Sequence, residues 1–113
     1  MFPGSTSLCI GGFIRMHQDR HFPENNLRFR YYNEPAFLDA YAEVFGEDVY
    51  HFESTHESPY IIDAGANLGL ASCYFKSRFP KAQVVAFEPD PRMQELFRWN
   101  MTTNGFEDVQ LMP

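Results

Sequence analysis

The sequence is poor in the residues that mark several large classes of protein. It has only two cysteines, Cys9 and Cys73, and neither their number nor their separation suits a disulfide framework or a zinc site. No apolar run approaches the ~18 residues that a membrane helix needs, and no basic region precedes the first apolar residues, as it would in a secretory signal. We therefore expect a cytoplasmic protein that does not act at a membrane.

Positive charge is scarce as well. The chain has 9 Lys and Arg against 15 Asp and Glu, a net charge of −6, and residues 33–59 contain no Lys or Arg at all. Nucleic-acid backbones are bound chiefly by Lys and Arg, so the composition argues against a nucleic-acid partner. His17 and His21 are spaced like two metal ligands on a helix, but no third ligand accompanies them, so we expect no metal site.

What is present suffices for one folded unit, because 44% of the residues are hydrophobic and 17% are aromatic. We interpret residues 1–59 as an N-terminal leader. Its first part, residues 1–33, is rich in Gly, Pro, Asn and Arg and predicts an irregular stretch with room for one strand. Glu34 and Pro35 then predict the start of an amphipathic helix over about 34–45, which Gly46 would end.

The pattern changes at Tyr60, and residues 60–113 alternate between strands and helices. Short apolar strands are predicted near 60–62, 83–87 and 109–112, with helices from about 70 to 79 and from 90 to 104. The order β-α-β-α-β predicts three neighbouring parallel strands. The fold class is therefore α/β, with part of a doubly wound, Rossmann-like parallel sheet and a helical N-terminal leader.

Ligands of such sheets bind beyond the carboxyl ends of the strands, which directs attention to the loop after the first strand. Asp63, Gly65 and Gly69 form a D-x-G-x-x-x-G spacing there. The G-x-G-x-x-G fingerprint of dinucleotide sites is absent, which makes an NAD-dependent oxidoreductase the less favoured alternative. Asn67 stands where a related pattern has a glycine, and asparagine enters the left-handed backbone region readily.

The second strand ends at Glu88, which is followed by Pro89. A carboxylate offers two acceptor oxygens, so Glu88 could accept hydrogen bonds from both hydroxyls of a ribose, with a base lying against Pro89. Because nothing in the first loop is fitted to a pyrophosphate, these residues predict a nucleoside ligand without one.

These two motifs, their separation and the helix that follows resemble the donor-binding half of FkbM-type class I methyltransferases. The resemblance spans Tyr60 to Leu111 and rests on an acid-x-Gly-Ala-Asn-x-Gly loop joined to a strand that ends in Phe-Glu-Pro. It implies S-adenosylmethionine as cofactor and methyl transfer to an oxygen of a sugar or small metabolite. It also implies donor contacts from Asp63, Gly65, Ala66, Asn67 and Gly69, and ribose contacts from Glu88.

The chain supplies only part of the sheet that the resemblance implies, so we expect it to be the first half of the donor-binding domain, truncated after the third strand. Neither the acceptor site nor a catalytic base can be assigned. A truncated or non-catalytic nucleoside-binding module is the alternative. Because the chain supplies only three strands of the sheet, the first strand would have an open edge, and we expect self-association through it.

Overall fold

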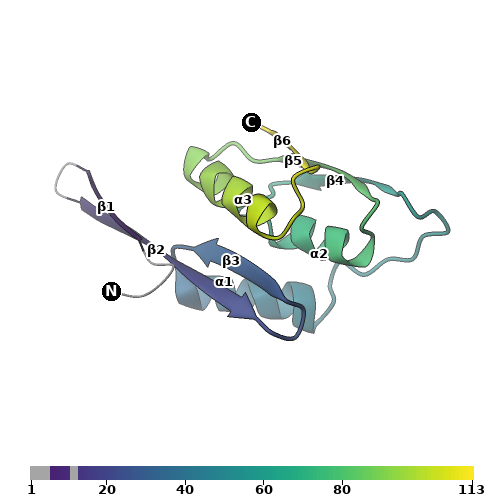
Figure 1. Cartoon of the computed structure of the whole chain (residues 1–113), viewed down its shortest axis with the longest axis horizontal. Coiled ribbons are helices and arrows are strands. Elements are labelled where there is room, and N and C mark those ends of the chain that lie inside the picture. Colours follow the sequence, from purple (N-terminus) through teal and green to yellow (C-terminus); the bar gives the residue numbers. More distant parts are fainter. Residues whose placement is uncertain (1–5, 11–12) are drawn as a thin grey trace.

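The computed structural model describes residues 6–10 and 13–113 and arranges them in layers (Figure 1). A parallel sheet forms one outer layer, two helices lie in the middle, and the N-terminal strands with their helix lie on the other side of these helices. The sheet contains β4 (Tyr60–Ala64), β5 (Gln83–Phe87) and β6 (Gln110–Met112), and the middle helices are α2 (Leu70–Arg78) and α3 (Pro91–Thr103). The N-terminal elements are β1 (Thr6–Ile10), β2 (Phe13–Phe22), β3 (Leu27–Tyr31), α1 (Glu34–Tyr41) and the π-helix η1 (Ala42–Gly46).

The parallel sheet confirms the predicted fold class. Its strands follow the order β4-β5-β6, and both strand pairs are parallel. The side chain of Asp90 accepts a hydrogen bond from the Arg92 N–H and caps α3, while Pro91 occupies the first turn, where its missing N–H has no partner to lose. Local sequence signals therefore set the order and the starts of these elements.

Only one face of this sheet is covered within the described residues. Ile61, Val84 and Ala86 point into the core that the sheet shares with α2 and α3. The alternate residues of the same strands face outward, and the exposed large apolar side chains among them are Tyr60, Ile62, Phe87 and Met112. In the described part of the chain, β4 pairs with β5 alone, so its other edge has no neighbouring strand.

The first part of the leader is not the irregular stretch that its composition predicts. Between residues 13 and 31 the described chain is mostly strand, with β2 paired antiparallel to β3 so that Phe22 faces Leu27 across the ladder. The turn between them depends on asparagines, because Asn26 adopts φ 58° and the Asn25 side chain accepts the Leu27 N–H. Sequence analysis missed β2 because its polar residues hide the alternation. Residues 1–5 and 11–12 of the leader lie outside the described residues.

The helix predicted at 34–45 is present as α1 followed by η1. The Asn33 side chain caps it by accepting the Ala36 N–H. Phe37 stacks on Tyr31 of β3 with ring centroids 4.2 Å apart, and Tyr41 stacks on Phe22 of β2 at 3.8 Å. These stacked pairs join the helix and the antiparallel strands into one aromatic core.

The helices of the described residues are all too short to cross a bilayer, since the longest of them, α3, has 13 residues.

Candidate functional site

A cavity of about 400 Å³ lies at the carboxyl end of β4, where sequence analysis placed the site. One wall is the loop between β4 and α2, and the opposite wall comes from the end of β3 and from α1 and η1. We call it the loop cavity. Its lining includes Tyr31, Tyr32, Asn33, Phe37, Glu43, Val44 and Tyr50 from the N-terminal part, and Asp63, Gly65, Ala66, Asn67, Leu68, Met93 and Leu96 from the rest.

The loop follows an unusual backbone path that its sequence permits. Gly65 has φ 72° and Asn67 has φ 51°, which confirms the expectation that Asn67 takes the left-handed conformation. The N–H groups of Gly65 and Ala66 both donate to the Phe87 carbonyl at 2.9 Å, tying the loop to the end of β5. A methyl group on Gly65 would meet nothing within 4 Å, so a ligand can approach the backbone there.

Gly69 serves packing and does not line the loop cavity. It has φ 101° at the start of α2, and a Cβ atom there would lie 2.5 Å from the Met101 methyl carbon and 3.0 Å from a ring carbon of Phe97. The absence of a side chain therefore lets α3 lie close to the loop. Of the five predicted loop residues, Asp63, Gly65, Ala66 and Asn67 line the cavity, and Gly69 does not.

Asp63 lines the cavity but is only 9% exposed. Burial raises the pKa of its carboxyl group, the nearby Glu88 charge adds to this, and the hydrogen bond from Ser72 opposes it. The Ser72 hydroxyl donates to Asp63 Oδ2 at 2.6 Å and is itself fully buried. Sequence analysis missed Ser72, because a small residue in the first turn of a helix carries no signal of its partner.

Glu88 is 4% exposed and bridges the two loops at the sheet edge. One carboxylate oxygen accepts the Asn67 N–H at 2.7 Å, and the other accepts the Asp90 N–H at 2.9 Å. Each oxygen retains a second lone pair, so the bridge does not use the full acceptor capacity of the group. Glu88 is not part of the cavity lining, and Pro89 is exposed outside it. The ribose contact of Glu88 and the base contact of Pro89 remain predictions.

The charge of the loop cavity restricts its ligand. Two carboxylates line it, Glu43 and Asp63, and none of the described lining residues is Lys, Arg or His. Three tyrosines, Tyr31, Tyr32 and Tyr50, contribute aromatic surface that can favour a cation. A phosphate group would meet negative charge here with no positively charged side chain among the described lining residues to offset it, whereas a positively charged ligand would be attracted. Among the described residues, no group of three or more His, Cys, Asp or Glu side chains could hold a metal ion.

Comparison with known proteins gives matches in sequence and in structure, although no protein-family model matches the chain. Methyltransferase sdnD of Sordaria araneosa is 39% identical over 64 residues, which is 57% of this chain and 25% of that protein. Methyltransferase 1 of Beauveria bassiana is 31% identical over 83 residues, which is 71% of this chain and 33% of that protein. The chain thus spans between a quarter and a third of the length of these relatives.

Among solved structures, P. horikoshii TYW2 in complex with MeSAdo superposes with a TM-score of 0.55 and 16% sequence identity. The match covers 96% of this chain and 34% of that one. Similarity at this level of identity concerns the fold, and it agrees with the parallel strand order of β4, β5 and β6. The chain therefore has part of a Rossmann-like α/β fold.

Proposed function

We propose that this chain is the donor-binding part of an S-adenosylmethionine-dependent methyltransferase of the FkbM type. The observation that carries the proposal is the charge of the loop cavity, where Glu43 and Asp63 supply two carboxylates and no described lining residue is basic. S-adenosylmethionine carries a positive sulfonium, an ammonium and one carboxylate group and has no phosphate, so its net positive charge is opposite in sign to that of this cavity. The same observation disfavours NAD, whose pyrophosphate would be repelled.

In this proposal the residues of the chain bind and orient the cofactor. The open face at Gly65 admits the ligand to the loop backbone, Glu43 and Asp63 attract its cationic groups, and the tyrosines exclude water from one side. Glu88 holds the loop in shape and has lone pairs left for ribose hydroxyls. When bound, the cofactor supplies an activated methyl group, so alignment with an acceptor oxygen supplies much of the rate.

The proposed reaction of the whole protein is O-methylation of a sugar or another small metabolite. Support for this comes from the resemblance of the Asp63–Gly69 and Phe87–Pro89 motifs to the FkbM type. The names of the two relatives, both methyltransferases, agree with the reaction class. No residue is assigned as a catalytic base.

The test is isothermal calorimetry of the 113-residue chain with S-adenosylmethionine and, separately, with NAD. We expect binding of S-adenosylmethionine alone. Glu43→Gln should weaken that binding about threefold to tenfold, as loss of one charge contact of ~1 kcal/mol would. Glu47→Gln is the matched control, because Glu47 is also exposed and directly follows η1 but does not line the cavity. Absence of binding by the unchanged chain, or equal effects of the two variants, would refute the proposal.

A further inference from the structure

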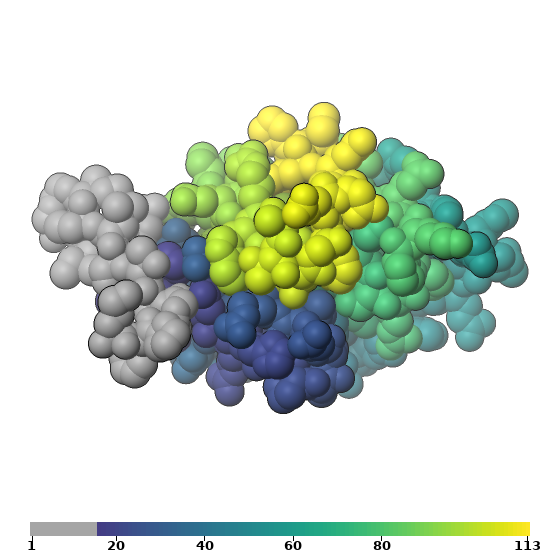
Figure 2. Space-filling view, in the orientation of Figure 1, coloured from purple at the N-terminus to yellow at the C-terminus, as the bar shows by residue number. Residues whose placement is uncertain are grey.

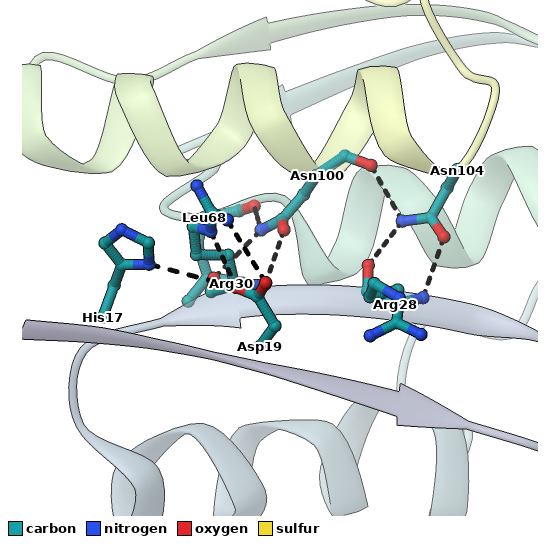
Figure 3. A network of polar contacts seen from close by, with 7 residues as sticks. All are labelled: His17, Asp19, Arg28, Arg30, Leu68, Asn100 and Asn104. Carbon is teal, nitrogen blue, oxygen red and sulfur yellow. Dashed lines mark hydrogen bonds and ion pairs between the residues drawn. The ribbon is translucent and has the colours of Figure 1, made fainter. Parts of the chain in front are cut away.

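One edge of β3 pairs with β2. The backbone groups of its other edge form hydrogen bonds with two asparagines of α3 instead of with a strand (Figure 3). Asn100 Oδ1 accepts the Arg30 N–H at 2.7 Å, and its Nδ2 donates to the Arg30 carbonyl at 3.3 Å. One helical turn later, Asn104 makes the same pair of bonds with Arg28, at 2.9 Å and 2.7 Å. Figure 2 shows α3 lying directly against the N-terminal part of the chain on the face in view.

The spacing of helix and strand explains why this pairing works. Four residues of an α-helix advance about 6 Å, and two residues of a strand advance about 6.6–6.8 Å. Asn100 and Asn104 therefore stand nearly opposite alternate residues of β3, whose N–H and C=O groups point to the same edge. A side-chain amide carries one acceptor and a donor group, as a backbone peptide does, so the two residues satisfy the edge as a neighbouring strand would.

Asn100, unlike Asn104, also bonds to the loop between β4 and α2. Its Nδ2 donates to the Leu68 carbonyl of this loop at 2.7 Å. Asn104 Nδ2 donates instead to the Asn100 carbonyl at 2.8 Å, within α3 itself, and the Asn104 side chain also contacts the Cys73 thiol of α2. Asn100 is fully buried, so a carbonyl that lost this donor would have no water to replace it.

The two residues that Asn100 holds stand beside opposite walls of the loop cavity. Arg30 is followed directly by Tyr31 and Tyr32, which line the N-terminal wall. Leu68 lies in the loop wall itself, and its carbonyl belongs to the peptide that leads into Gly69 at φ 101°. A single side-chain amide thus joins both walls and sets the orientation of the loop peptide.

We propose that Asn100 is a positioning residue for the cofactor site, which it serves by holding the Leu68 carbonyl of the loop and the Arg30 peptide of β3 in one hydrogen-bonded unit. The inference rests on the proposed function for its ligand, but its structural part does not need a ligand. Asn100 couples the N-terminal sheet to the loop, so the shape of the cavity depends on both.

The experiment compares Asn100→Ser with Asn104→Ser in the 113-residue chain. Both variants lose an amide that pairs the β3 edge, and we expect Asn100→Ser to lose more stability to urea, because Asn100 is fully buried and also holds the Leu68 carbonyl. Only Asn100→Ser should speed amide hydrogen exchange of residues 65–69, by tenfold or more, and weaken binding of S-adenosylhomocysteine in calorimetry by a similar factor. Equal loop exchange in the two variants, or an Asn100→Ser chain with unchanged loop exchange, would overturn the inference.

Two further measurements separate the possible failures. If the unchanged chain does not bind S-adenosylhomocysteine, the proposed function is in error, and hydrogen exchange alone decides the role of Asn100. If Asn100→Ser does not fold, the side-chain amide resonances of the unchanged chain are followed by nuclear magnetic resonance as S-adenosylhomocysteine is added. The Asn100 resonances should shift and those of Asn104 should not. Unchanged Asn100 resonances in the presence of shifted Asn104 resonances would refute the inference.

Discussion

The Glu88 carboxylate accepts the backbone N–H of Asn67 at 2.7 Å and so fastens the loop after β4 to the end of β5. Its second oxygen accepts the Asp90 N–H at 2.9 Å, which joins the start of α3 to the same group. One buried side chain therefore holds the two loops that sequence analysis treated as separate parts of a site.

Replacing Glu88 by Gln should loosen this connection. An amide has one acceptor oxygen where the carboxylate has two, so one of the two backbone N–H groups loses its partner. We expect the free energy of unfolding to fall by about 1–3 kcal/mol and hydrogen exchange at Asn67 or Asp90 to accelerate. Glu95→Gln is the control, because Glu95 is exposed on α3. Unchanged exchange at both N–H groups would contradict the bridging role.

The two glycines of the loop should differ in their response to alanine. Gly69→Ala places a methyl group 2.5 Å from the Met101 methyl carbon at a position with φ 101°, and it should lower the free energy of unfolding by about 2–5 kcal/mol. Gly65→Ala meets no atom within 4 Å and should lower it by about 1–2 kcal/mol, through backbone strain alone. Urea denaturation of both variants measures the difference, and equal losses would show that contact with α3 is unimportant.

Asp63 should make the stability of the chain depend on pH. Burial raises the pKa of its carboxyl group, so the folded chain holds the proton more tightly than the unfolded chain does. The contribution of Asp63 to the free energy of unfolding must therefore fall as the pH rises from the ordinary aspartate pKa to the raised value of the folded state. Asp63→Asn removes this fall and keeps an acceptor for the Ser72 hydroxyl.

Denaturation by urea between pH 3 and pH 7 tests this prediction. Relative to the unchanged chain, Asp63→Asn should gain stability as the pH rises, while Asp39→Asn, at an exposed position of α1, should show no such trend. A pH-independent difference for Asp63→Asn would mean that its carboxyl group is not perturbed by burial.

The exposed face of the parallel sheet should cause the isolated chain to self-associate. Tyr60, Ile62, Phe87 and Met112 expose apolar surface there, and none of the other outward-facing residues of these three strands is charged. A second copy can cover this face without opposing charge, despite the net charge of −6. In sedimentation velocity experiments, Ile62→Lys should shift the chain toward monomer. Thr103→Lys adds the same charge at the exposed end of α3 and should have no effect.

Local signals in the sequence sufficed for the order of elements from β4 to β6 and for the position of the loop. Glycine, proline and asparagine act on their own backbone, so the left-handed conformation of Asn67 and the start of α3 at Asp90 and Pro91 could be predicted. The same reasoning placed α1 and η1, because an apolar stripe at helical spacing needs only its own segment to be recognised.

Only the tertiary structure determines which distant residues these elements bring into contact. The strand β2 has a weak local pattern, and its Phe22 packs on Tyr41 of α1. The strand β3 alternates apolar and basic residues, but only the tertiary structure shows that α1 stacks on its Tyr31 and that the asparagines of α3 bond to its edge. Asn100 is separated by 70 positions from Arg30, and Glu88 by 21 from Asn67. A hydrogen bond between such distant residues depends on how whole elements pack, which neither composition nor spacing records.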